Sequence, residues 1–301
     1  MLVANNTSII TNGDIAEFII YVNMLTWPVA SVGWVTSLVQ QAEASQKRIN
    51  AFLKQKPSVL NTQKNMSVIN GEIAFENVHF TYKDTNIEAL KGISFKVEQG
   101  KTLAIIGKTG SGKTTILELI GRMYNITKGD LKIDDISIKN INLHSLRDSI
   151  GYVPQDSFLF SDTLNNNIKF GKNNATKQEV IQAAKDAVVH DNIINFSKGY
   201  DTILGERGIT LSGGQKQRVS IARAFIKSPK ILLLDDCLSA VDTETEEQIL
   251  NNIERISKNT TTVIVSHRIS SVKNADHIIV LEGGQIIQEG THNQLMINNG
   301  Y

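Results

Sequence analysis

The sequence predicts an α/β domain with a largely parallel sheet, preceded by one membrane-spanning helix. Three observations carry this prediction. An apolar strand, a glycine-rich loop and a helix follow one another over residues 102–120. A continuously apolar strand that ends in carboxylates begins at residue 231, another strand with the pattern of a buried one covers residues 260–266, and residues 18–42 contain no charged side chain. Strands that are apolar throughout are typical of a sheet covered on both faces, and long uncharged helices suit a bilayer.

The glycine loop GKTGSGKTT has the spacing G-x-x-x-x-G-K-[ST] of a phosphate-binding loop. Glycines let successive backbone N–H groups turn around an anion, because they tolerate positive φ and carry no Cβ. Lys113 would contact the β and γ phosphates, the Thr114 hydroxyl would ligate Mg²⁺, and the N-terminus of the following helix would add its partial positive charge. A chance glycine-rich turn is the alternative. The expected nucleotide-binding residues are Gly107, Lys108, Thr109, Gly110, Ser111, Gly112, Lys113, Thr114 and Thr115.

The composition narrows the function classes. A formal net charge of +1 provides no broad basic field, so a nucleic-acid partner is not expected. The single cysteine, Cys237, cannot form an internal disulfide, which suits a reducing compartment. No basic segment precedes an early apolar stretch, so a cleaved signal peptide is not expected.

Residues 15–56 are predicted to form a membrane helix with a cytoplasmic extension. A bilayer core needs about 20 apolar residues in a helix. The positive-inside rule places residues 1–14 on the extracytoplasmic side and the rest of the chain in the cytoplasm. A buried helix of a soluble protein is the alternative. The basic residues that follow the apolar stretch are Lys47, Arg48, Lys54 and Lys56.

A linker and a second domain follow the membrane helix. Residues 57–70 are polar and rich in helix breakers, so we interpret them as the linker. Residues 72–82 alternate like a strand and residues 90–97 form a second strand candidate. Tyr82, just upstream of the glycine loop, could stack on an adenine ring or could be an ordinary surface residue of the strand.

The middle of the second domain is expected to be helical. Gln155 follows an apolar strand and Pro154, where it could serve a site or simply a turn. Residues 156–198 are polar with a helical pattern, which indicates a helical insertion in an α/β domain, ending at about residue 227.

The segment LSGGQ at residues 211–215 precedes another helix. Ser212 is a suitable N-cap, and the glycines at 213 and 214 expose backbone donors, so this could be a second anion-binding helix terminus. An ordinary capped helix is the alternative.

The apolar strand ILLL at residues 231–234 leads into two carboxylates, Asp235 and Asp236. Ligands gather outside the carboxyl ends of such strands, so Asp235 could hold Mg²⁺ and Asp236 could act on a water molecule. Two ordinary turn carboxylates are the alternative. His267 follows the next apolar strand and could be a site residue or a surface residue, and residues 278–287 are predicted to form a hairpin.

These segments together resemble the nucleotide-binding domain of ABC transporters. The glycine loop, Tyr82, Gln155, LSGGQ, ILLLD, the segment SAVD at 239–242 and His267 have the family's order, over about residues 71–291 of a domain that extends to residue 301. The segment LGERG at 204–208 is similar to the X-loop of exporters, which lies by the coupling helices of the membrane domain. Among half-transporters the sequence most resembles MdlA-like subunits of heterodimeric multidrug-type exporters.

The resemblance implies an ATPase in which two such domains close head to tail on two ATP molecules, so that the membrane helices follow. The implied Mg²⁺ ligands are Thr114, Gln155 and Asp235, beside the phosphate contact of Lys113. Tyr82 would stack on adenine, and Asp236, His267 and Gln155 would form the catalytic group. The residues expected to reach the partner's nucleotide or to link the two sites are Ser212, Gly213, Gly214, Gln215 and Asp242.

Two departures from the family pattern are present. The family's usual general base after ILLLD is a glutamate, whereas this chain has Asp236. We therefore expect a slow site on this chain and a competent site on a heterodimeric partner completed by this chain's LSGGQ; a regulatory subunit with little ATP turnover is the alternative. The second departure is that exporter halves carry several membrane helices, so the chain is expected to be a fragment of a multi-pass protein of the cell or inner membrane.

The transported substrate remains open among drug, lipid and peptide classes. Membrane lipid is an expected partner of the helix. A soluble ABC-type ATPase acting on DNA or ribosomes is disfavoured, because no long insertion separates the glycine loop from LSGGQ and no basic stripe is present.

Overall fold

The computed structural model describes residues 11–205, 211–257 and 260–297. The chain divides into two compact units, Met1–Pro57 and Ser58–Tyr301. The first unit contains helix α1 (Asn12–Leu53), and the second contains every strand of the described residues.

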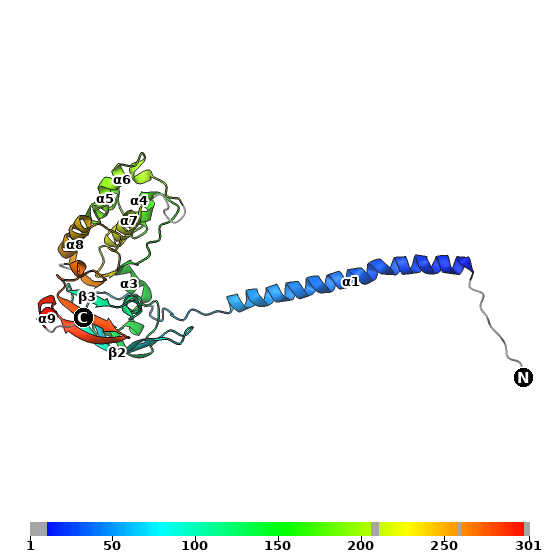
Figure 1. Ribbon diagram of the computed structural model, residues 1–301, viewed down its shortest axis with the longest axis horizontal. Helices are drawn as coiled ribbons and strands as arrows, with labels where there is room; N and C mark the ends of the chain where they lie inside the picture. Colours follow the sequence, from blue (N-terminus) through cyan, green and yellow to red (C-terminus); the bar gives the residue numbers. More distant parts are fainter. Residues whose placement is uncertain (1–10, 206–210, 258–259, 298–301) are drawn as a thin grey trace, which may run out of the picture. The chain divides into compact units, whose positions relative to one another are not determined.

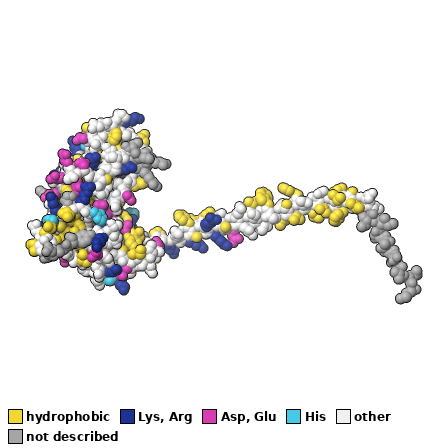
Figure 2. Space-filling view, viewed as in Figure 1, with side chains coloured by type: hydrophobic (Ala, Val, Ile, Leu, Met, Phe, Trp, Pro, Cys, Tyr) yellow, Lys and Arg dark blue, Asp and Glu magenta, His cyan; other side chains and the backbone are white. Residues whose placement is uncertain are grey.

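Helix α1 begins with a capping box. The Thr11 hydroxyl accepts a hydrogen bond from Asp14 N at 3.3 Å, and the Asp14 carboxylate accepts one from Thr11 N at 2.8 Å, so the helix starts at Asn12 rather than at residue 15. None of its side chains is buried, and Figure 2 shows hydrophobic side chains along it. Within the described residues, α1 is the helix whose length and composition suit a membrane crossing.

The second unit contains two sheets (Figure 1). The antiparallel sheet has the order β2-β1-β4-β5, and its strands are β1 (Ile73–Thr81), β2 (Glu88–Val97), β4 (Lys128–Ile133) and β5 (Ile136–Ser137). The other sheet has the order β10-β9-β3-β8-β7-β6 and is parallel except at its edge strand β10. Its strands are β3 (Thr102–Gly107), β6 (Ile150–Val153), β7 (Ile231–Asp235), β8 (Thr261–Val265), β9 (His277–Glu282) and β10 (Gln285–Gly290).

The helices of the second unit fall into two groups. Helices α4 (Leu164–Lys169), α5 (Lys177–Asp186), α6 (His190–Ile194) and α7 (Gly213–Phe225) gather together in Figure 1, within the expected insertion at 156–227. The remaining helices are α2 (Lys113–Ile120), α3 (Leu143–Asp148), α8 (Thr243–Ser257) and α9 (His292–Ile297), with short 3-10 turns at η1 (Ile138–Asn140), η2 (Gly199–Asp201) and η4 (Ile269–Ser271).

Strand β7 contributes to two hydrophobic cores, one on each face of its sheet. Ile231 and Leu233 pack in the core shared with α2 and the antiparallel sheet, while Leu232 and Leu234 pack in the core shared with the helical group. Alternate residues of a strand point to opposite faces, which explains why this strand is apolar throughout. The predicted α/β class with a parallel sheet and an apolar N-terminal helix is confirmed.

Candidate functional site

The loop between β3 and α2 requires glycine at both ends. A Cβ at Gly107 (φ +152°) would lie 2.1 Å from the carbonyl oxygen of Leu281, and one at Gly112 (φ +103°) would lie 2.7 Å from that of Ala89. At Gly110 (φ +80°) no atom of a non-neighbouring described residue lies within 4 Å of the Cβ position. The two ends are therefore fixed by packing, while the middle of the loop faces open space and leaves room for a ligand.

The buried polar groups of this loop are arranged for an anion. Lys113 Nζ donates to the carbonyl oxygens of Gly107 at 2.8 Å and Lys108 at 2.9 Å, so the ammonium is held over the loop. Burial lowers the pKa of Lys113, against the opposing charges of Asp235 and Asp236. The Ser111 hydroxyl is buried and makes no hydrogen bond within the described residues. A buried hydroxyl normally has a partner, and a phosphate oxygen would supply one.

Asp235 lies at the carboxyl end of β7 and faces the start of α2. The Thr114 hydroxyl donates to Asp235 Oδ1 at 3.2 Å, and Asp235 is 2% exposed. Burial raises the pKa of Asp235, and the nearby carboxylate of Asp236 adds to this, whereas the Thr114 hydrogen bond opposes it. The half-buried Tyr152 also has a raised pKa, because of burial first and then the charge of Asp235. A hydroxyl and one carboxylate at this junction fit Mg²⁺, which usually keeps several waters and shares substrate phosphates.

Asp236 adopts a left-handed backbone conformation with φ +43°. Its N–H donates to the Val265 carbonyl at 2.9 Å, which holds the residue against the end of β8. Positive φ is uncommon outside glycine and is tolerated best by Asn and Asp. The chain therefore turns sharply at Asp236, between β7 and the segment that leads to α8.

One cavity of about 540 Å³ gathers most of the predicted site residues. It is bordered by the glycine loop, by the carboxyl ends of β7 and β8, and by the starts of β2 and β10. Parallel strands end at the same sheet edge, which explains how distant segments meet here. The predicted residues that line it are Tyr82, Thr109, Gly110, Gly112, Lys113, Thr114, Thr115, Gln155, Asp235, Asp236 and His267.

Tyr82 lines this cavity with its hydroxyl tied to α2. The hydroxyl lies 2.9 Å from Thr115 Oγ1 and donates to Glu118 Oε2 at 3.0 Å. Its ring packs edge-on against Phe80 and Tyr124, with centroids 4.8 and 5.4 Å away. Burial raises the pKa of Tyr82 to about 12, so the phenol stays protonated. Stacking of this ring on adenine stays a prediction.

The LSGGQ segment lies outside the cavity. Ser212 caps α7, since its hydroxyl accepts from Gln215 N at 3.3 Å and its own N–H donates to Gln215 Oε1 at 3.0 Å. Ser212 is exposed, and Gly214 approaches the next loop so closely that a Cβ would lie 2.8 Å from the Ala240 carbonyl oxygen. The structure thus places Ser212, Gly213, Gly214, Gln215 and the exposed Asp242 away from the glycine loop of the same chain. The X-loop residues at 206–208 lie outside the described residues.

Several lining residues were not anticipated from the sequence. Glu88, Lys91 and the turn glycines Gly283 and Gly284 border the cavity. The Lys91 N–H donates to the Gly284 carbonyl at 2.9 Å, joining the hairpin to the antiparallel sheet. In the sequence, the pair of glycines indicated only a hairpin turn. The turn lies beside the glycine loop because β9 pairs with β3, and this pairing is not visible in the local sequence.

Replacing Asp235 with Asn is expected to stabilise the nucleotide-free chain while weakening Mg²⁺-dependent ATP binding. A carboxyl whose pKa is raised on folding destabilises the folded state when ionised, so the variant should unfold at a higher temperature than the wild type near pH 8. The gap should shrink as the pH falls toward about 3.9, the ordinary pKa of Asp. Thermal unfolding in EDTA across this pH range measures the effect.

Asp276→Asn provides the matched control, because this exposed carboxylate is paired with Lys101 at 3.0 Å and accepts from Thr102 N at 2.8 Å. It should give no stabilisation at pH 8. Equal unfolding temperatures for wild type and Asp235→Asn across the range would contradict the assignment of a destabilising buried carboxylate.

The chain is similar to known exporter proteins. Residues 90–239 match the family model described as ABC transporter. The chain is 43% identical over 293 residues to the probable multidrug resistance ABC transporter ATP-binding/permease protein YheI of Bacillus subtilis, covering 97% of this chain and 50% of that protein. It is 41% identical over 292 residues to the multidrug resistance-like ATP-binding protein MdlA of Escherichia coli, with 97% and 50% covered.

A solved structure gives the same result in three dimensions. A bacterial Atm1-family ABC exporter with ATP bound superposes with a TM-score of 0.82 at 38% identity, covering 96% of this chain and 51% of that one. The chain thus spans about half the length of the proteins that it matches.

Proposed function

The chain carries the nucleotide-binding domain of the ABC transporter family next to an apolar helix, and we propose that it is the ATP-hydrolysing subunit of an exporter. ATP binding would close two such domains on each other, and hydrolysis would release them. The transported substrate would be a drug, a lipid or a peptide.

The observation that carries this proposal is the division of the site into two parts. The cavity holds the glycine loop, Asp235, Asp236, Gln155 and His267, whereas the capped LSGGQ helix lies outside it. One face of a nucleotide bound in the cavity would therefore stay uncovered by this domain, and another protein surface could contact it. A second copy of such a domain offers that surface in the N-terminus of its LSGGQ helix, whose backbone donors and dipole favour an anion.

The residues present fit Mg²⁺ and ATP. Thr114, Asp235 and Gln155 would hold the metal, and the orphaned Ser111 hydroxyl together with Lys113 would bind phosphate oxygens. When bound, Mg²⁺ would neutralise charge that develops on the transferred phosphoryl group. On this chain, Asp236 would accept a proton from the attacking water, and His267 would contact the terminal phosphate.

The side chain of Asp236 supports an asymmetric pair. It is one methylene shorter than the family's glutamate, so its carboxylate is set back by about 1 Å, a displacement that can cost on the order of 100-fold in rate. The LSGGQ cap is intact, with both hydrogen bonds of its capping box formed. This combination favours a heterodimer in which the chain contributes a slow site and completes a faster one on its partner. A regulatory subunit with little turnover is the second candidate, and the same residue favours it.

The first unit supports a place in the membrane. Helix α1 exposes all of its apolar side chains, among them Phe18, Leu25, Trp27 and Trp34. Exposed apolar surface of this length is satisfied by lipid or by other membrane helices. We place α1 in a multi-pass membrane domain of the parent protein and the second unit in the cytoplasm, as the basic residues after the apolar stretch indicate.

The helical group offers a surface for the membrane domain. Phe158, Phe160 and Phe170 are exposed by 51, 38 and 60%, and their rings lie together with centroids 5.1 and 4.7 Å apart. The guanidinium of Arg223 lies 5.6 and 5.5 Å from the rings of Phe160 and Phe170. Exposed aromatic clusters with an arginine are typical of interaction sites, so this cluster would transmit domain closure to the membrane helices.

Replacing Ser212 with Asp is expected to abolish the ATP-dependent association of two domains while leaving ATP binding to each cavity intact. Asp retains the helix cap but places a negative charge where the partner's phosphate must arrive. We expect the wild-type full-length chain in detergent to dimerise with Mg-ATP in analytical ultracentrifugation, and the Ser212→Asp chain to stay monomeric while still binding ATP in its own cavity.

Ser212→Asn is the matched control, since Asn caps equally well and differs from Asp mainly in charge. It should dimerise with Mg-ATP. Loss of ATP binding to the cavity in Ser212→Asp, or the same behaviour for Asp and Asn, would contradict the division of the site between two domains.

A further inference from the structure

The loop at residues 236–242 connects the cavity with the start of α8. Asp236 lies at its cavity end, and Asp242 lies at its other end, where its carboxylate accepts from Thr245 N at 3.0 Å. The Asp242 carbonyl also accepts from Glu246 N at 2.8 Å. The loop is thus attached to the cavity at one end and to α8 at the other.

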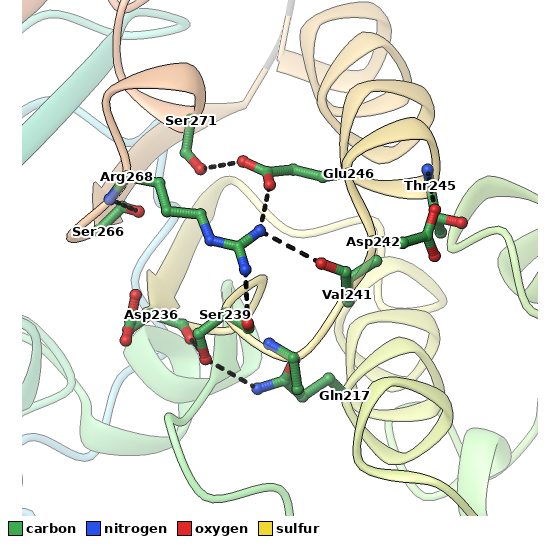
Figure 3. A network of polar contacts seen from close by, with 11 residues as sticks. Gln217, Asp236, Ser239, Val241, Asp242, Thr245, Glu246, Ser266, Arg268 and Ser271 are labelled. Atoms are coloured by element: carbon green, nitrogen blue, oxygen red, sulfur yellow. Dashed lines mark hydrogen bonds and ion pairs between the residues drawn. The ribbon is translucent and has the colours of Figure 1, made fainter.

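Arg268 holds the middle of this loop by two backbone carbonyls (Figure 3). Its Nη2 donates to the Ser239 carbonyl at 2.7 Å, and its Nη1 donates to the Val241 carbonyl at 3.2 Å. The planar guanidinium presents several donors in a fixed fork, which a lysine ammonium cannot reproduce. Arg268 directly follows His267, which lines the cavity, so one short segment contacts both the candidate ATP site and the loop.

Glu246 fixes the orientation of the Arg268 guanidinium. Its Oε2 lies 2.6 Å from Arg268 Nη1, and its Oε1 accepts from the Ser271 hydroxyl at 2.5 Å. The Glu246 side chain is 3% exposed, and a buried carboxylate is stable only when its charge is paired and its oxygens are hydrogen-bonded. The contacts from Arg268 and Ser271 therefore lock one geometry for the arginine, as Figure 3 shows.

The opposite side of the loop is held by the LSGGQ helix α7. Gln217 Oε1 accepts from Ala240 N at 3.2 Å, and Gln217 Nε2 donates to Ser239 Oγ at 3.4 Å. Ser239 Oγ in turn donates to the Asp236 carbonyl at 3.0 Å. A displacement of α7 would therefore be passed through Ser239 to the backbone of Asp236, and through the loop carbonyls to Arg268.

We propose that Arg268, oriented by Glu246, is a positioning residue for ATP hydrolysis that keeps Asp236 and His267 in register with the LSGGQ helix of the same chain. Arg268 contacts two backbone carbonyls and a buried carboxylate, and it does not line the cavity. It therefore acts through its neighbours. A partner domain that presses on the loop or on α7 would alter the geometry of this chain's own ATP site. The inference rests on the proposed ATPase function.

The test uses the full-length chain in detergent with the variants Arg268→Lys and Glu246→Gln. Each should lower kcat for phosphate release by about 10- to 100-fold, as expected for a small misplacement of catalytic groups. KM and the Kd for ATP should change by no more than about twofold, because neither residue borders the cavity. The double variant should be no slower than the worse single variant, since both changes act through one guanidinium. Backbone amides at 239–241 should exchange hydrogen faster in both.

Arg255→Lys is the matched control. Arg255 lies on α8 and, like Arg268, pairs with a carboxylate, but its partner is Asp186, which is not part of the loop. This variant should change neither kcat nor the exchange of the loop. A lower unfolding temperature with unchanged kcat in the Arg268 and Glu246 variants would overturn the proposal, as would a parallel rise in KM. If the wild-type chain binds ATP but releases no phosphate, the proposed ATPase function is wrong. In that case, unchanged amide hydrogen exchange at residues 239–241 in Arg268→Lys would separately overturn the role of Arg268.

Discussion

Replacing Lys113 with Ala is expected to weaken the binding of Mg-ATP by about 10- to 100-fold. A hydrogen bond to a charged group contributes about 1.5–3 kcal/mol, and 1.4 kcal/mol corresponds to a tenfold change in affinity. In the structure, Lys113 Nζ already lies over the loop through its bonds to the Gly107 and Lys108 carbonyls, so little reorganisation is needed to reach a phosphate. Titration of the full-length chain with ATP and Mg²⁺ measures the loss directly.

Lys101→Ala is the control for the removal of a lysine from this sheet. Lys101 immediately precedes β3, is paired with Asp276, and its side chain is 53% exposed. A surface ion pair contributes little to stability, and this one lies outside the cavity. Lys101→Ala should bind ATP as the wild type does. Equal affinity of the Lys113→Ala and wild-type chains would contradict the assignment of the glycine loop as the phosphate site.

The features that could be predicted from the sequence are those encoded by short spacings. The order of β3, glycine loop and α2 follows from contiguous residues, and the cap at Ser212 follows from Gln215 three positions later. The apolar run of β7 indicated burial on both faces, which the two hydrophobic cores explain. Each of these features depends on local backbone geometry or on periodicity, so it could be predicted from a single segment of the sequence.

The features that could not be predicted depend on contacts between distant segments. Arg268 and Glu246 meet across the loop only because β8 and α8 come together in the fold, and no motif spacing marks the two carbonyls that Arg268 binds. The hydroxyl of Tyr82 is likewise tied to Thr115 and Glu118 on α2, which its position in a strand did not indicate. Side-chain partners of this kind follow from the strand order and the packing rather than from residue type.

The site also combines stability costs with its expected chemistry. Asp235 carries a raised pKa and Lys113 a lowered one, both because burial disfavours their charges. The Ser111 hydroxyl adds a buried group without a partner in the described residues. Such costs are typical of sites that bind charged ligands, since the ligand supplies the missing partners. ATP with Mg²⁺ should therefore raise the unfolding temperature, because a ligand that binds only the folded state stabilises it.

Replacing Asp236 with Glu is expected to raise ATP hydrolysis by on the order of 100-fold, because the added methylene carries the carboxylate about 1 Å further toward the attacking water. Asp236 borders the cavity and its backbone is held by the bond from its N–H to Val265, so a longer side chain extends from a fixed point. Phosphate release by the full-length chain with Mg-ATP measures the gain. Asp236→Asn, which has the same size but cannot accept the proton, should be slower than the wild type.

A mixing experiment then tests whether ATP turnover at one site depends on the residue at 236 of one domain and on LSGGQ of the other. The double variant Asp236→Glu with Ser212→Asp has a competent base but a blocked LSGGQ, and should be inactive alone. Mixed with the wild-type chain, it should gain activity, because the wild-type Ser212 completes the site that contains Glu at 236. A mixture no faster than the wild type alone, together with no gain for Asp236→Glu by itself, would contradict the proposal that the short carboxylate limits turnover. The double variant should gain activity only in the mixture if the two halves of one site come from two domains, which is the arrangement that we propose from the position of Ser212 outside the cavity.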